Sequence, residues 1–160
     1  MIFSTFGLFK QRLLLTKFLD KISTDKTAVF WGKKHPKRRK LAHILRLPLL
    51  NLEDGFLRSV GLGVSGYPPY SIVYDDIGIY YDTTRPSRLE QLILAAETMP
   101  SETLAQARQA MNFILQHHLS KYNHAPELSD DHPLRSPSKP ETVLIIDQTF
   151  GDMAIQYGGA

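Results

Sequence analysis

Apolar residues along the chain alternate between short β-prone runs and stretches with helical spacing. Thr27 to Trp31 is a β-prone run, Arg38 to Leu47 has the spacing of a helix, and Pro48 to Leu52 is a second strand candidate. This order predicts a strand–helix–strand unit of an α/β fold. Glu53 and Asp54 follow the second strand, at the carboxyl end where open α/β sheets place their ligand crevice.

The middle of the chain predicts two short strands and then two helices. Ser71 to Tyr74 and Ile77 to Tyr81 are rich in β-branched and aromatic residues, so we expect a pair of strands there. The sequence at residues 85–87 is typical of a helix start, and Ser101 opens a second helix that extends through Leu119.

The carboxyl-terminal part predicts a change of domain. Residues 125–141 hold four prolines among Ser, Asp and His, which is typical of a linker. Thr142 to Ile146 is the most strand-like run in the chain. We therefore predict an amino-terminal α/β lobe over residues 1–124, a Pro-rich linker over 125–141 and the start of a truncated second α/β lobe over 142–160.

The amino terminus allows two interpretations. Met1 to Ile22 is apolar but lacks a basic start, and Lys10, Arg12 and Lys17 interrupt it, so neither a cleavable signal nor a spanning helix fits. Its apolar residues recur near helical spacing. The segment is either a strand and helix buried in the fold or an interfacial helix on a membrane surface.

The composition narrows the class of protein. The chain has 160 residues, 42% of them hydrophobic, which suits a globular domain. The net charge is +3, and much of the positive charge lies in a run over residues 33–40. A solvated loop with a first helical turn explains such a run, and an anionic partner is the alternative. Because the charge is not spread along a groove-facing element, we expect no nucleic-acid partner.

Several chemistries find no support in the sequence. Without cysteine the chain has no disulfide, thiol nucleophile or zinc knuckle, which suits the cytoplasm. The six histidines lack metal-ligand spacing, so we predict neither a metal nor a cofactor. Residues 61–66 fit the pattern G-x-G-x-x-G, but Tyr67-Pro68-Pro69 follows instead of a helix, so we interpret them as a glycine-rich turn.

Acidic residues form the candidate catalytic clusters. These are Glu53 with Asp54, Asp75 with Asp76, and Asp147 with Asp152. Paired carboxylates suit glycosyl transfer, because one can attack the anomeric carbon while another takes the acceptor proton. Asp152 is favoured because it follows a predicted buried strand and a glycine that permits close approach to a substrate.

Several strings occur in a characteristic order along the chain. They are Phe30-Trp31-Gly32, Leu52-Glu53-Asp54-Gly55-Phe56-Leu57-Arg58-Ser59, Leu62-Gly63 with Pro68-Pro69, Asp76-Ile77-Gly78-Ile79-Tyr80-Tyr81-Asp82, Arg85-Pro86-Ser87, Leu119-Ser120-Lys121-Tyr122-Asn123 with Ala125-Pro126, and Asp147-Gln148-Thr149-Phe150-Gly151-Asp152. In this order they resemble the amino-terminal region of the KpsC/LipA capsule polysaccharide export and biosynthesis family. The resemblance covers the chain from about Met1 to Ala160.

The resemblance implies a fold and an activity. Members of the family are similar to two-lobed GT-B enzymes, so the chain would be the first Rossmann-like lobe of such a glycosyltransferase, with only the first strand of the second lobe. They look like retaining β-Kdo transferases that use CMP-Kdo and build on a lysophosphatidylglycerol or Kdo-lipid acceptor. The expected place is the cytoplasm of a Gram-negative bacterium, peripheral on the inner membrane, beside capsule assembly proteins.

The resemblance also implies roles for site residues. The spacing of Gln148 and Asp152 matches a motif of related retaining Kdo transferases, in which the aspartate forms a covalent sugar adduct. Gln148 would orient the carboxylate or the donor. Glu53 would be the acceptor-side base. Asp54, Arg58 and Asp147 would bind substrate, and Arg58 could meet the Kdo carboxylate in a bidentate pair.

The sequence also departs from the family pattern. The Lys-x-His-Pro-Asp string and the nucleotide-holding region that should follow Asp152 are absent. We therefore expect the 160-residue chain alone to lack transferase activity. The alternative function is a non-catalytic membrane-surface or assembly module of the capsule machinery.

Overall fold

A four-stranded sheet forms the centre of the fold. The computed structural model describes residues 1–10, 12–19, 26–132, 135, 145 and 151–159. The strands β1 (Ile2–Phe3), β2 (Ala28–Trp31), β3 (Leu49–Asp54) and β4 (Ile72–Asp75) lie side by side in this order. β1, β2 and β3 are parallel, and β4 is antiparallel to β3. The predicted α/β class is confirmed, as are the strands predicted at Thr27 to Trp31 and Pro48 to Leu52.

Helices cover the two faces of this sheet. The short helices α1 (Phe6–Lys10) and α2 (Arg12–Leu19) bring Leu8, Leu15 and Leu19 against Val29, Leu50 and Leu52. On the opposite face, Ala42 of α3 (Pro36–Ile44) packs against Ala28 and Phe30. Because successive strand residues point to opposite faces, β2 supplies side chains to both clusters. The β-prone sequence of this strand is therefore buried on both sides.

The amino-terminal segment packs on the sheet, and its contact with a membrane surface stays a prediction. Leu8, Leu15 and Leu19 are buried in the core, as a strand and helix of the fold require. Phe6 and Leu13, by contrast, are 70% and 73% exposed. Within the residues described, no helix is long and apolar enough to cross a membrane.

Ile77 to Tyr81 does not form a strand, so that prediction was wrong. The Asp75 carboxylate at the end of β4 accepts hydrogen bonds from the backbone N–H groups of Ile77 (2.8 Å) and Gly78 (2.7 Å), which turns the chain. It also accepts from the N–H of Arg88 (2.9 Å). β4 instead pairs with β3. Asp75 is thus a buried structural residue, and its neighbour Asp76 pairs with Arg88 at the surface.

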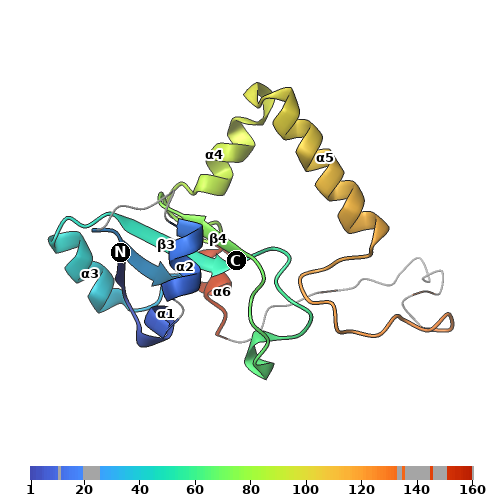
Figure 1. Cartoon of the computed structure of the whole chain (residues 1–160), viewed down its shortest axis with the longest axis horizontal. Coiled ribbons are helices and arrows are strands. Elements are labelled where there is room, and N and C mark those ends of the chain that lie inside the picture. The colour runs from blue at the N-terminus through green and yellow to red at the C-terminus, as the bar shows by residue number, and fades with distance from the viewer. Residues whose placement is uncertain (11, 20–25, 133–134, 136–144, 146–150, 160) are drawn as a thin grey trace.

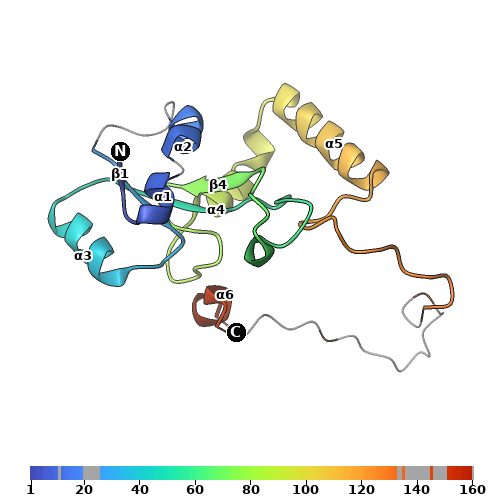
Figure 2. The same ribbon diagram turned by 60° about the horizontal axis from the view of Figure 1, so that its bottom comes forward.

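Both predicted helices are present. A capping box, in which Ser87 and Glu90 each accept a backbone hydrogen bond, starts α4 (Arg88–Leu94). A short 3₁₀ helix, η2 (Ala96–Thr98), separates it from α5 (Ser101–Gln116). α5 ends at Gln116 and not at Leu119 as predicted, because His118 has a left-handed φ of 50° that closes the last turn. Figures 1 and 2 show α4 and α5 as an arm that extends away from the sheet.

After this arm the chain returns to the sheet. The Lys121 carbonyl accepts hydrogen bonds from the N–H groups of Arg58 and Ser59, and the N–H of Asn123 donates to the Val60 carbonyl (2.7 Å). Gly63–Ser65 is a 3₁₀ turn, η1, and no α-helix follows it directly, in agreement with the predicted glycine-rich turn. The last described element is α6 (Met153–Tyr157). Most of the predicted linker and most of the strand predicted at Thr142 to Ile146 lie outside the described residues.

Candidate active site

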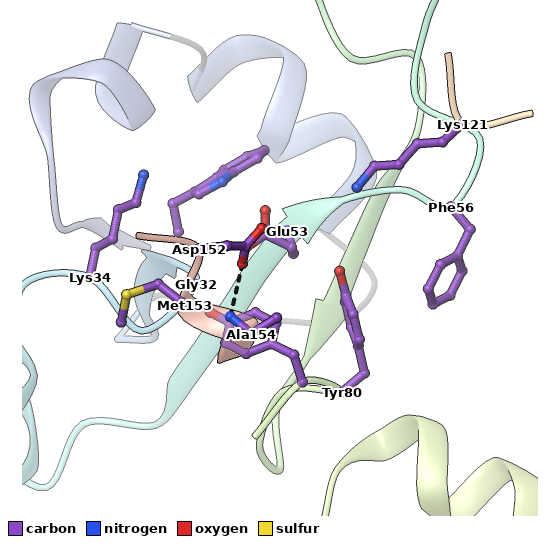
Figure 3. A pocket seen from close by; sticks show the side chains of 11 residues that line it. Gly32, Lys34, Glu53, Phe56, Tyr80, Lys121, Asp152, Met153 and Ala154 are labelled. Atoms are coloured by element: carbon purple, nitrogen blue, oxygen red, sulfur yellow. Dashed lines mark hydrogen bonds between the residues drawn. The ribbon is translucent and has the colours of Figure 1, made fainter. Parts of the chain in front are cut away.

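A pocket of about 500 Å³ lies at the carboxyl ends of the parallel strands β2 and β3. Its walls come from Trp31 and Gly32 after β2, Glu53 near the end of β3, the loop at Tyr80 and Tyr81, and the start of α6. This is the edge at which open α/β sheets bind ligands. Figure 3 shows Glu53 and Asp152 on facing elements of the pocket.

Glu53 is a half-buried carboxylic acid in the wall of this pocket. Its Oε1 accepts a hydrogen bond from the N–H of Asp54 (3.1 Å), and the Trp31 side chain is a second hydrogen-bond partner. Burial raises the pKa of Glu53 above its ordinary value, and the charge of Asp54 adds to this effect, while the Asp54 N–H, Lys34 and Trp31 oppose it. A carboxylate with a raised pKa can accept a proton from a substrate hydroxyl.

Gly32 lets the groups around Glu53 come close together. A Cβ at this position would lie 2.6 Å from the Tyr81 hydroxyl and 2.9 Å from Glu53 Oε2. Its φ of 52° is also left-handed, which favours glycine. A side chain at position 32 would therefore displace Glu53 and Tyr81 from their places in the pocket.

Asp152 is exposed at the start of α6. One oxygen of its carboxylate accepts a hydrogen bond from the N–H of Ala154 (2.8 Å), so Asp152 is the N-cap of this helix (Figure 3). Since Met153 and Ala154 also line the pocket, Asp152 faces it across from the end of β3.

Contacts at the carboxyl end of α6 hold this helix against the rest of the site. The Tyr157 carbonyl accepts hydrogen bonds from the N–H (2.9 Å) and the hydroxyl (3.1 Å) of Thr83. The Lys33 ammonium lies 4.5 Å from the centre of the Tyr157 ring. Lys33 is in turn ion-paired with Asp82, whose side chain is completely buried. The position of Asp152 thus depends on the loop at residues 82–84.

Asp82 anchors that loop. Burial by itself would raise the pKa of Asp82, but hydrogen bonds from Lys33 and from the hydroxyl and N–H of Thr84 outweigh it and lower the pKa from 3.8 to about 2. The carboxylate therefore stabilises the fold fully above pH 3.8. This stabilisation is lost as the pH falls through about 2.

We expect Asp82→Asn to destabilise the chain by about 3 kcal/mol at pH 7, because it leaves the Lys33 ammonium without its buried partner. Denaturant unfolding at several pH values measures the effect, and the difference from the native chain should shrink between pH 4 and pH 2. Asp76→Asn is the matched control, since its ion pair with Arg88 is exposed and should contribute less than about 1 kcal/mol. Equal destabilisation by the two changes would contradict the assigned role of Asp82.

The pocket also contains residues that the acidic motifs did not indicate. Two ammonium groups line it, those of Lys34 and Lys121, together with the rings of Trp31, Phe56 and Tyr80. The rings of Phe56 and Tyr80 are 5.3 Å apart. Burial, with the charges of Glu53 and Asp152 among its neighbours, raises the pKa of Tyr80 to about 12, so its hydroxyl is a donor at neutral pH. In Figure 3 the Lys121 ammonium and the Tyr80 hydroxyl point into the same space.

The remaining predicted site residues lie elsewhere or outside the described part. Asp54 and Arg58 form an ion pair (Oδ2 to Nε, 2.8 Å), and Arg58 also donates to the Ser59 hydroxyl (2.8 Å) and the Tyr67 carbonyl (2.9 Å). This pair supports the end of β3 behind Glu53 and does not line the pocket. Asp147 and Gln148 are outside the described residues. Among the residues described, no three His, Cys, Asp or Glu side chains gather in a way that could hold a metal ion.

The fold and the pocket define an α/β protein with a polar pocket at the carboxyl ends of parallel strands, the edge at which such sheets bind small molecules. The pocket has two acidic and two basic lining residues beside aromatic ones. The chain belongs to the capsule polysaccharide biosynthesis protein family, whose profile matches residues 26–160.

Relatives support this membership. The chain is 84% identical over 134 residues to the capsule polysaccharide modification protein LipA of Neisseria meningitidis serogroup B, a match over 82% of this chain. It is 40% identical over 141 residues, 86% of this chain, to the lipopolysaccharide-processing protein LpsZ of Rhizobium meliloti. The chain spans 19% of the length of LipA and 31% of that of LpsZ.

Two solved structures resemble the chain. The β-Kdo 2,4 transferase of KpsC from Thermosulfurimonas dismutans matches 99% of this chain with a TM-score of 0.80 and 38% identity, and the match covers 52% of that structure. The β-Kdo 2,7 transferase of the same protein matches 98% of the chain with a TM-score of 0.58, covering 50% of that structure. At 23% identity, the second match shows a common fold alone.

Proposed function

We propose that the chain contributes one side of the active site of a retaining glycosyltransferase that transfers Kdo from CMP-Kdo. The observation that carries the proposal is the placement of Glu53 and Asp152 on facing elements of one pocket. The likeness to a β-Kdo 2,4 transferase at 38% identity supports the sugar and the reaction. The GT-B architecture and a lysophosphatidylglycerol or Kdo-lipid acceptor are part of the same proposal.

In the proposed reaction, an Asp152 oxygen attacks the anomeric carbon of Kdo. The bond from that carbon to the phosphate oxygen breaks, CMP leaves with the electron pair, and a glycosyl ester forms on Asp152. The acceptor hydroxyl then attacks the same carbon while its proton passes to Glu53, and the Asp152 carboxylate is released. Two inversions at the anomeric carbon give net retention.

The other pocket residues suit the charge and shape of these substrates. CMP-Kdo carries a phosphate and a carboxylate, and the ammonium groups of Lys34 and Lys121 can pair with such groups. Phe56 and Tyr80 offer aromatic surface to the apolar side of a sugar ring. Asp54 and Arg58 would hold the strand end that carries Glu53. Gln148 and Asp147 keep their proposed roles in orienting and binding substrate.

The alternative, a non-catalytic membrane-surface or assembly module, is favoured by one observation. Exposed apolar and basic side chains occur together in α2 and α3. A cytoplasmic location on the inner membrane, next to capsule assembly proteins, suits both functions. The two are compatible, because a surface contact can hold an enzyme near its acceptor.

The release of CMP from CMP-Kdo tests the proposed function. We expect turnover by a protein extended to the full length of its relatives and none by the 160-residue chain. Lys121→Gln in the extended protein should raise KM for CMP-Kdo or an acidic acceptor about tenfold, because a charge-assisted hydrogen bond is lost. Lys121→Arg should retain most of the affinity.

Two results would contradict the proposal. Turnover by the 160-residue chain would show that the pocket is complete without further residues. An extended protein that folds but releases no CMP with any Kdo acceptor would leave the binding or assembly function as the better account. Arg108→Gln, an exposed charge on α5, is the matched control for the loss of a positive charge.

A further inference from the structure

A second pocket lies beside the candidate active site. It has a volume of about 220 Å³, and its lining includes Ile72 and Val73 of β4 and Leu89 and Leu92 of α4. Since Leu89 and Leu92 are three residues apart, they lie on the same side of the helix. α4 has no buried residue, and Leu92 is 47% exposed, so these side chains do not fill the space beside β4. The apolar side chains of α4 thus border an open pocket.

The second pocket and the candidate active site share a wall. Phe56 and Tyr80, whose rings are 5.3 Å apart, line both of them (Figure 3). Glu53 of the candidate active site is paired with Val73 of the second pocket across β3 and β4. Directly opposite residues of an antiparallel pair point to the same face of the sheet, with Cβ atoms about 5 Å apart. A ligand bound at Glu53 therefore has to extend only a short way, past Phe56 and Tyr80, to reach the second pocket.

The charged groups in the lining of the second pocket are already paired. The Asp75 carboxylate accepts three backbone hydrogen bonds, one of them from the N–H of Arg88. The Arg88 guanidinium donates to the Asp76 carboxylate (2.6 Å). A sugar in this pocket would give up hydrogen bonds with water and gain few in return, which costs free energy. A hydrocarbon group has no hydrogen bonds to lose, and its burial among aliphatic side chains is favourable.

We propose that the second pocket binds an alkyl group of the acceptor, while the reacting hydroxyl of the same molecule lies at Glu53. The inference rests on the proposed function, because the acceptor is the one of that reaction. A polar pocket next to an apolar one suits an amphiphilic molecule that places its polar end in the first and its hydrocarbon in the second. CMP-Kdo, the proposed donor, has no alkyl chain, so the second pocket is assigned to the acceptor.

This assignment makes the second pocket a determinant of acceptor choice. An acceptor without an alkyl group can still place its hydroxyl at Glu53, but it leaves the second pocket to water. An acceptor with an alkyl group displaces that water and buries apolar surface, which strengthens its binding. Val73 and Leu92 would thus set the affinity for the acceptor and not the affinity for CMP-Kdo.

A matched pair of acceptors, the methyl and octyl glycosides of Kdo, tests the inference with the extended protein. The two molecules have the same hydroxyl groups and differ in the alkyl group alone. They are used without vesicles and below the concentration at which micelles form, so a membrane surface plays no part. We expect KM for the octyl glycoside to be lower than KM for the methyl glycoside by about tenfold or more. Val73→Thr with Leu92→Gln should remove most of this difference, because both changes place a polar group in the second pocket.

Leu94→Gln is the matched control, because Leu94 is 83% exposed on the same helix and lies outside the pocket lining. This variant should keep the difference between the two glycosides. Circular dichroism shows whether each variant is folded, and the preference of the native protein is a test that needs no variant. Titration calorimetry with the two glycosides in the absence of CMP-Kdo measures their affinities without the reaction.

The outcomes separate this inference from the proposed function. Release of CMP with equal KM values for both glycosides, or a preference that survives the double variant, would overturn the inference alone. No release with either glycoside would contradict the proposed function. In that case a tighter titration of the octyl glycoside, lost in the double variant, would still support an alkyl site, and equal affinities would overturn it. Tighter binding of a methyl glycoside with two Kdo units, lost in the double variant, would assign the second pocket to a sugar and overturn the inference.

Discussion

Asp152→Asn in the extended protein should abolish Kdo transfer and prevent the formation of a Kdo adduct. An amide cannot form the glycosyl ester, and the loss of a nucleophile lowers turnover by about a thousandfold or more. Asparagine is nearly as good an N-cap as aspartate, so the variant should keep the hydrogen bond to the Ala154 N–H that starts α6. Intact-mass spectrometry after incubation with CMP-Kdo detects the adduct, and CMP release gives the rate.

Asparagine removes the nucleophile but keeps the N-cap of α6, so this substitution tests the catalytic role without changing the structure. Asp152→Ala removes the cap and the nucleophile together, and would destabilise α6 by about 1 kcal/mol. Asp131→Asn, an exposed carboxylate outside the pocket, is the matched control and should leave turnover unchanged. An Asp152→Asn protein that still forms the adduct would show that another residue is the nucleophile.

Local sequence rules predicted the two central strands and one residue of the candidate pocket. β2 is a β-prone run and β3 begins with a short apolar run, both of which become buried, so their pattern identified them. Glu53 was predicted because carboxyl ends of parallel strands form the ligand edge of a sheet, and it lines the pocket. Residues 85–87 likewise predicted the start of α4, for which Ser87 is the N-cap.

The features that the sequence did not predict depend on contacts between residues far apart in the chain. Lys121 reaches the pocket only because the chain returns after α5 and hydrogen-bonds to Arg58 and Ser59, more than sixty positions earlier. The predicted strand at Ile77 to Tyr81 failed for a related reason. Its β propensity is overridden by the Asp75 carboxylate, which binds two N–H groups that a strand would have needed.

The places of Tyr80 and Tyr81 in the pocket also depend on residues far away in the sequence. Tyr81 accepts a hydrogen bond from the Lys33 N–H (3.0 Å), and the hydroxyl of Tyr80 is near the charges of Glu53 and Asp152. The close spacing of Gly32, Glu53 and Tyr81 is likewise a tertiary contact that no local sequence pattern indicates. The sequence around these tyrosines resembles that of the family, but only the structure shows that they line the pocket.

Glu53→Gln in the extended protein should slow transfer by about a hundredfold to ten-thousandfold, because a glutamine cannot accept the acceptor proton. The first half of the reaction does not use this base, so the Kdo adduct on Asp152 should still form and should accumulate. With Glu53 present, turnover should rise with pH through the raised pKa of this residue, since only the ionised form is a base. The variant should lack this rise.

The Glu53→Gln variant should lose activity but not stability. The raised pKa means that folding favours the protonated form of Glu53, so the ionised form costs free energy that is absent below pH 4.5 and grows as the pH rises through the folded-state pKa. We therefore expect Glu53→Gln to match or exceed the native protein in Tm at pH 7, with Glu97→Gln on the exposed η2 as the control. A variant that loses stability and forms no adduct would instead make Glu53 a structural residue, because the loss of the base of the second step should leave both the fold and the first step intact.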